Sequence, residues 1–143
     1  MKIFSVVGYL IIVSSILVLC AIRALVATAP LFIIIQVLAF VLMIWARATF
    51  GRRSFHLAAN PTAGGLVTTG PYRVIRHPIY AAIFYFILAA VCSHVTVITI
   101  VVACIAYAGI AVRMFAEEKL IVKEYPEYAE YASRTKRIVP YIF

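Results

Sequence analysis

Residues 77–112 decide the fold, and they read HPIYAAIFYFILAAVCSHVTVITIVVACIAYAGIAV, 36 residues without Asp, Glu, Lys or Arg. A single helix of that length would reach roughly 54 Å, whereas the hydrocarbon core of a bilayer is about 30 Å thick. The segment must therefore turn back on itself, and Ser93-His94 is the only polar pair near its middle. We predict a helical hairpin made of Pro78–Cys92 and Val95–Val112.

Two further charge-free runs precede this hairpin, at residues 3–22 and 24–46. The whole chain is 66% hydrophobic and 13% charged, whereas a soluble domain carries about 25% charged residues. A small globule cannot hide so much apolar surface from water. The sequence therefore predicts an all-α, polytopic integral membrane protein with about four transmembrane helices.

The basic residues are divided unequally between the two sides of this topology. All of them except Arg23 fall on the side of both termini and of residues 47–77. The positive-inside rule then places that side in the cytoplasm, and we expect a prokaryotic inner or plasma membrane. Orientation and anionic lipid headgroups explain the net charge of +8, so we expect a lipid bilayer and no nucleic acid as partner.

We expect one membrane domain over residues 1–143. Its parts are two N-terminal membrane helices (1–47), a cytoplasmic loop rich in Gly and Pro (48–77), the hairpin (78–112) and a cytoplasmic tail (113–143). The tail predicts an amphipathic helix from Phe115 to Arg134, interrupted at Pro126. We expect the basic pair Lys136-Arg137 to contact anionic headgroups.

The hairpin begins at a densely polar stretch, Gly70 to Tyr80. Pro78 suits a first helical turn and disfavours helical backbone at His77, so we predict that the helix begins at Pro78 with His77 at its cap. The unpaired N–H groups of such a terminus favour an anion, and Arg73 and Arg76 add positive charge. An ordinary interfacial helix start is the alternative interpretation.

A second polar group follows the hairpin. Arg113 and Glu117 are four residues apart and share a helix face, where an ordinary salt bridge worth a few tenths of a kcal/mol is the alternative. A site with both Arg and Glu suits a zwitterionic ligand. No acid lies inside the membrane runs, which disfavours a proton-coupled transporter. The three cysteines lack metal-ligand spacing, and we expect no metal site.

Five short motifs occur in the order typical of the isoprenylcysteine carboxyl methyltransferase family. They are GLVTTGPY at 65–72, RHPIY at 76–80, Arg113 with EEKL at 117–120, YAEY at 128–131 and RIVP at 137–140. Over roughly residues 64–140 the chain resembles this family, which itself resembles phospholipid methyltransferases.

The resemblance implies a membrane methyltransferase that uses S-adenosylmethionine and a lipophilic methyl acceptor entering from the membrane. It implies cofactor-binding roles for a set of residues on the loop, the hairpin start and the tail: Leu66, Val67, Tyr72, His77, Pro78, Ile79, Tyr80, Glu117 and Glu118. It implies that Arg113 faces the acceptor, with Arg76 as the next candidate for orienting it.

The acceptor stays open at this point. An isoprenylcysteine-type carboxylate needs no base, whereas a phospholipid amine or a small thiol must lose a proton, and His77 or a tyrosine is then the nearest candidate base. We expect His77 to act as a cap or hydrogen-bond donor instead. A non-catalytic structural or partner-binding membrane protein on the same scaffold is the second hypothesis, and it predicts no cofactor affinity.

Overall fold

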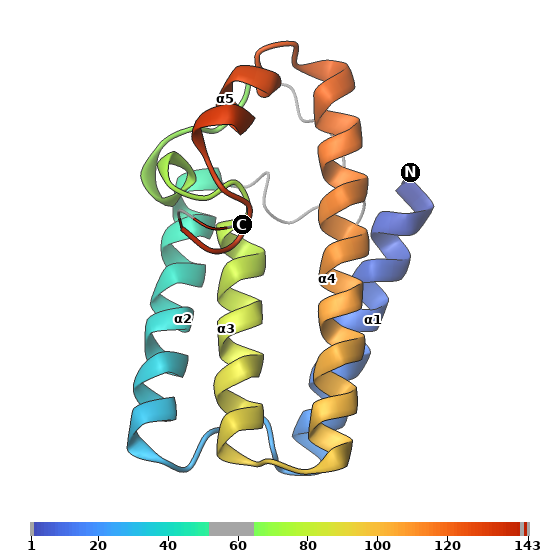
Figure 1. Ribbon diagram of the computed structural model, residues 1–143, viewed down its shortest axis with the longest axis vertical. Coiled ribbons are helices and arrows are strands. Elements are labelled where there is room, and N and C mark those ends of the chain that lie inside the picture. Colours follow the sequence, from blue (N-terminus) through green and yellow to red (C-terminus); the bar gives the residue numbers. More distant parts are fainter. Residues whose placement is uncertain (1, 52–64, 141, 143) are drawn as a thin grey trace.

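The computed structural model describes residues 2–51, 65–140 and 142. These residues form α-helices and one short 3-10 helix, and none of them forms a strand: α1 (Lys2–Ala21), α2 (Pro30–Phe50), η2 (Gly70–Arg73), α3 (Pro78–Ser93), α4 (Val97–Glu124) and α5 (Tyr128–Arg134). Helices α1 to α4 run alongside one another, and α5 lies over one end of them (Figure 1). The predicted all-α fold is confirmed for this part of the chain.

Three of the helices, α1, α2 and α4, are long and apolar enough to cross a membrane. Their apolar side chains face outward, as on α2, where Leu31 is 64% and Phe40 60% exposed. Exposed apolar faces of this extent suit contact with lipid rather than water. Helix α3 is apolar too, but its 16 residues reach roughly 24 Å, so a count of four spans stays a prediction.

The predicted hairpin is confirmed, with α3 beginning at Pro78 and the turn falling at Ser93 and His94. Its second arm differs from the prediction, because α4 continues past Val112 to Glu124 as one helix. Residues 113–124 are rich in strong helix formers, and no proline interrupts them before Pro126. The break expected at Pro126 is present, and the short α5 follows it.

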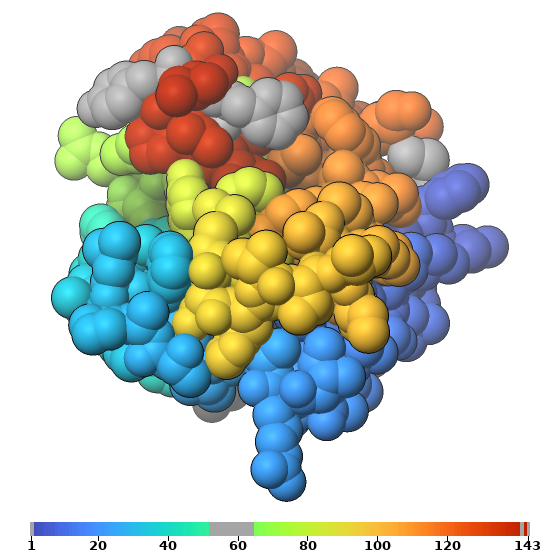
Figure 2. Space-filling model, turned by 60° about the horizontal axis from the view of Figure 1, so that its bottom comes forward, coloured from blue at the N-terminus to red at the C-terminus, as the bar shows by residue number. Residues whose placement is uncertain are grey.

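The two turns opposite α5 are joined to each other. The Ser93 hydroxyl oxygen accepts a hydrogen bond from the Thr28 amide at 2.8 Å, and His94 Nε2 lies 2.8 Å from the Val26 carbonyl oxygen. Figure 2 shows the α3–α4 turn in yellow beside the α1–α2 turn in light blue at this end. The bonds hold the ends of the two helix pairs in register.

Helix α1 packs on α4, and α2 packs on α3. At the α1–α4 crossing a Cβ added to Gly8 would lie only 2.7 Å from the Gly109 carbonyl oxygen, so the crossing needs glycine. Ala103 and Ala106 of α4 are buried in the same interior. This close approach brings the first turns of α1 beside Arg113, where the candidate site begins.

Candidate functional site

Charged side chains gather where α3 begins, where the last turns of α4 lie and where the tail returns. They form two groups around consecutive acids of α4. We name the first the Glu117 cluster (Tyr80, Arg113 and Glu117) and the second the Glu118 cluster (Arg76, His77, Glu118 and Arg137).

The Glu117 cluster joins α3 to α4 through one carboxylate oxygen. The Tyr80 hydroxyl donates to Glu117 Oε1 at 2.5 Å, and Arg113 Nε donates to the same oxygen at 3.1 Å. Arg113 Nε also lies 2.6 Å from the Tyr80 hydroxyl oxygen. Among the described residues, the second oxygen of Glu117 has no hydrogen-bond partner. The carboxylate therefore keeps one oxygen available for a ligand.

Helix α1 closes the other side of Arg113. The Ser5 carbonyl oxygen accepts from Arg113 Nη1 at 3.3 Å, and the Arg113 guanidinium lies 5.1 Å from the centre of the Tyr9 ring. As a result the Arg113 side chain is only 8% exposed. A guanidinium held this way is a fixed positive charge with little water around it, which strengthens its attraction for an anion.

The Glu118 cluster uses both oxygens of its acid. Oε1 accepts from Arg76 Nε at 3.2 Å and lies 3.1 Å from His77 Nε2. Oε2 accepts from Arg137 Nε at 3.1 Å and Nη2 at 3.0 Å. We expected Arg137 at lipid headgroups, but its guanidinium pairs with Glu118 because the tail folds back over α4.

Backbone bonds fasten the tail to the segment that precedes α3. The Arg76 amide donates to the Lys136 carbonyl oxygen at 2.6 Å, and the His77 amide donates to that of Arg137 at 3.0 Å. The Arg76 side chain adds a bond from Nη1 to the Thr135 carbonyl oxygen at 2.8 Å. The start of α3 and the tail therefore form one unit.

A tyrosine pair reinforces this unit. The Tyr131 hydroxyl donates to the Tyr72 carbonyl oxygen at 2.7 Å. Burial raises the pKa of Tyr131 to about 12, so the hydroxyl keeps its proton at neutral pH. Burial, with Tyr131 and Glu117 nearby, likewise raises the pKa of Tyr72.

Comparison of the sequence with known families identifies the family to which the chain belongs. The model of the isoprenylcysteine carboxyl methyltransferase (ICMT) family matches residues 26–123, more than half of the chain. The chain belongs to the ICMT family. The matched residues include α2, α3 and α4 as far as Lys123, and α1 lies before them in the sequence.

Two curated relatives match the chain. The nickel-cobalt-cadmium resistance protein NccN of Alcaligenes xylosoxydans xylosoxydans is 38% identical over 77 residues, 52% of this chain and 36% of that protein. The cobalt-zinc-cadmium resistance protein CzcN of Cupriavidus metallidurans is 33% identical over 76 residues, 52% of this chain and 35% of that protein. The match thus spans about a third of each relative's length. No solved structure matches the chain.

Several of the predicted site residues meet at the two clusters. His77 occupies the predicted N-cap position of α3, but its side chain makes no capping hydrogen bond and contacts Glu118 instead. Pro78 is the first residue of the helix, and Ile79 follows it half-buried. Helix N-termini favour negative charge, and the start of α3 is such a terminus.

Other predicted residues lie apart from both clusters. Leu66 and Val67 are half-buried in irregular backbone before η2, without a hydrogen bond to either acid. Tyr72 is buried in η2 with its ring 5.5 Å from that of Phe50. Within residues 2–51, 65–140 and 142, no group of three or more His, Cys, Asp or Glu side chains is arranged to hold a metal ion.

Some residues that shape the site were not predicted. Ser5 and Tyr9 reach Arg113 only through the α1–α4 crossing, for which the sequence carries no motif. Tyr128 belongs to the YAEY motif but was given no role. Its hydroxyl is buried near Glu118 and has no hydrogen-bond partner among the described residues. Burial and the nearby Glu118 carboxylate raise the pKa of Tyr128, so its hydroxyl keeps its proton at neutral pH.

Proposed function

We propose that this chain is a membrane methyltransferase that uses S-adenosylmethionine to methylate a lipophilic acceptor reaching the site from the bilayer. An isoprenylcysteine-type carboxylate is the acceptor most like the family. The observation that carries the proposal is the Glu117 cluster, in which a buried, fixed Arg113 lies beside a carboxylate with one oxygen that no described residue contacts. Family membership supports the methyl donor.

The residues present fit the cofactor. S-adenosylmethionine carries an ammonium, a carboxylate and a sulfonium. The unused oxygen of Glu117 suits the ammonium, and the start of α3 at Ile79 and Tyr80 suits the carboxylate. We assign the aromatic ring of Tyr72 and the apolar Leu66 and Val67 to the walls around the cofactor.

The other acid holds these groups in place. With both oxygens engaged by Arg76, His77 and Arg137, Glu118 has no capacity left for a direct ligand. We propose that it acts by positioning, keeping the tail over the start of α3. Arg76 then orients the substrate indirectly, through the tail that its guanidinium fastens.

Little further chemistry is required of the protein. When bound, S-adenosylmethionine supplies a methyl group already activated by its sulfonium. Arg113 orients an acceptor carboxylate, which attacks without a base, and helix α1 keeps water away from that guanidinium. His77 faces Glu118 and serves as a hydrogen-bond donor rather than as a base.

The proposal includes a topology. The described helices act as one membrane domain, in which α3 is a fourth, short span. Both termini lie on the cytoplasmic side of a prokaryotic inner or plasma membrane. The charged last turns of α4 and the α5 tail then lie on the membrane's cytoplasmic face, where water-soluble cofactor is present. The basic residues on that side support this orientation.

Transfer of a labelled methyl group tests the function. Purified protein in membranes is given S-adenosylmethionine with a tritiated methyl group, and the organic extract is counted with and without added farnesylcysteine, phosphatidylethanolamine or a small thiol. We expect label in the extract, released as methanol by alkali because the product is a methyl ester. Arg113→Gln lowers this transfer at least 100-fold, while the matched Arg134→Gln leaves it unchanged.

Each other outcome is informative. Label that resists alkali identifies an amine or thiol acceptor and contradicts the carboxylate. If folded parent protein transfers no label to any acceptor and binds no S-adenosylhomocysteine, the non-catalytic scaffold is correct instead.

A further inference from the structure

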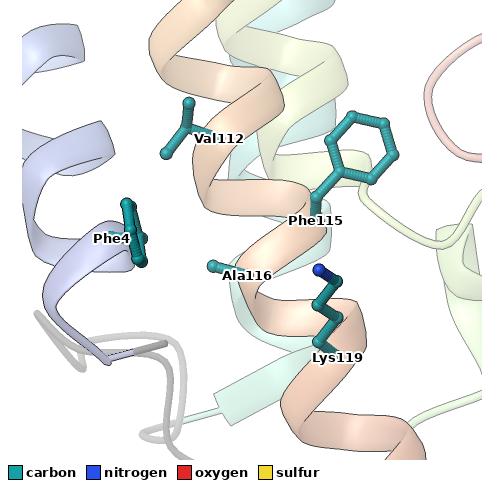
Figure 3. Close-up of a pocket in the computed structure, with 5 residues that line it drawn as sticks. All are labelled: Phe4, Val112, Phe115, Ala116 and Lys119. Carbon is teal, nitrogen blue, oxygen red and sulfur yellow. The ribbon is translucent and has the colours of Figure 1, made fainter.

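A groove lies between α1 and α4, on the outer side of the Glu117 cluster. Its volume is about 220 Å³, and its walls come from one residue of α1 and four of α4: Phe4, Val112, Phe115, Ala116 and Lys119. Figure 3 shows Phe4 across from Val112 and Ala116, with the Lys119 ammonium turned back along α4 toward Phe115. Among the described residues that line the groove, Lys119 is the one charged side chain.

The four α4 residues are spaced by three and four positions, so they form one stripe along the helix. The last residue of the stripe is the positively charged Lys119. It is exposed and, among the described residues, forms no ion pair. The Arg137 guanidinium, which is paired with Glu118, lies 5.2 Å from the centre of the Phe115 ring and adds no unpaired charge to the groove. The groove therefore combines an apolar channel with positive charge at one end.

The position of the groove along α4 suits a ligand with an apolar chain and a charged headgroup. Measured along α4 from its start at Val97, Lys119 lies roughly 33 Å away, just beyond a hydrocarbon core of about 30 Å. Taking the start of α4 as one edge of the hydrocarbon core puts Val112 and Phe115 within the core. It puts Lys119 at the level of the headgroups, where lysine side chains extend naturally.

We propose that this groove binds an anionic phospholipid, with one acyl chain between Phe4 and Val112 and the headgroup phosphate at Lys119. The bound lipid braces α1 against α4 at the turn whose Ser5 carbonyl holds Arg113. This lipid is a structural ligand and not the methyl acceptor. The inference goes beyond the proposed function and does not depend on it.

Lipid binding measured without any methyl donor tests the proposal. Purified protein in neutral detergent is titrated with phosphatidylglycerol or phosphatidylcholine, and bound lipid is counted by native mass spectrometry. We expect one saturable phosphatidylglycerol site, with phosphatidylcholine about fivefold weaker. Lys119→Gln weakens phosphatidylglycerol about fivefold and removes the preference, whereas the matched Lys123→Gln, one turn further along α4, changes neither.

A second variant tests the apolar channel separately from the charge. Val112→Trp fills the groove at a position that is 37% exposed, so the fold is kept, and we expect the saturable site to be lost for both lipids. Equal binding of the two lipids by the parent, parent-like binding by Lys119→Gln, or an equal loss in Lys123→Gln would each overturn the proposal.

Discussion

Glu117 and Glu118 are consecutive residues of one helix, yet their surroundings differ in kind. Glu117 is held through one oxygen by groups from α3 and α4, and its other oxygen has no partner among the described residues. Glu118 is held through both oxygens by the start of α3 and by the tail. One residue step turns a side chain by about 100° around a helix, so neighbours in sequence face different partners.

In the proposed function, Glu117 binds the cofactor and Glu118 anchors the tail. A carboxylate with both oxygens bonded to cations stabilises the fold but has no capacity for a ligand. A carboxylate with an unused oxygen beside a fixed guanidinium is prepared for one. The following substitutions test this separation.

Glu118→Gln is expected to have the largest effect on stability. It leaves Arg76, His77 and Arg137 facing a neutral amide in a largely buried place, and removing one partner of a buried pair costs about 3 kcal/mol or more. The free energy of unfolding, measured by denaturant titration in detergent, should fall by about that amount. Proteolysis of the tail should become faster.

The matched control is Glu130→Gln, which breaks the pair of Glu130 with Arg134 on the surface of α5. Both side chains are about 70% exposed, so the loss should stay below about 0.5 kcal/mol. Equal losses in the two variants would show that Glu118 does not anchor the tail.

Gly8→Leu should have the next largest effect, and it acts on the Glu117 side alone. The added side chain meets the Gly109 carbonyl oxygen, and overpacking of this kind costs about 2 kcal/mol. Because α1 then moves away from Arg113, methyl transfer should fall while tail proteolysis stays at the parent rate. Val7→Leu, at an exposed neighbouring position, is the control. A tail that loosens in Gly8→Leu would mean that the two clusters are not separate.

Tyr131→Phe should have a smaller effect, on the Glu118 side. It removes the hydrogen bond to the Tyr72 carbonyl oxygen and lowers stability by about 1 kcal/mol. The raised pKa of Tyr131 means that its stabilisation is complete below pH 10 and is lost as the pH rises toward about 12. Melting temperatures between pH 8 and 12 should therefore fall less steeply in the variant. An identical alkaline slope in parent and variant would contradict this role.

The sequence was sufficient for the parts of the fold that depend on local rules. The length of the charge-free run required a hairpin, and Pro78 placed the start of α3. The single helix through Arg113 was not foreseen, because a charged residue was taken as the end of the membrane helix, whereas α4 continues as one helix to Glu124.

The parts of the site that depend on contacts between residues far apart in the chain could not be predicted from the sequence. Arg137 reaches Glu118 from 19 residues away, and Ser5 reaches Arg113 from 108 residues away. Neither pair has a spacing that a helix or turn would reveal. The sequence motifs singled out residues at the start of α3 and on α4 as candidates. The different partners of the Glu117 and Glu118 oxygens became visible only in the packed structure.

The role of Glu117 in binding the cofactor is measured by isothermal titration of S-adenosylhomocysteine into the parent protein and into Glu117→Gln. Melting temperatures are taken alongside. Gln keeps the acceptor for Tyr80 and Arg113 but loses the charge that an ammonium needs. We predict saturable binding by the parent, binding at least tenfold weaker in Glu117→Gln, and melting temperatures that differ little. Parent-like affinity in Glu117→Gln would contradict the assignment of this carboxylate to the cofactor.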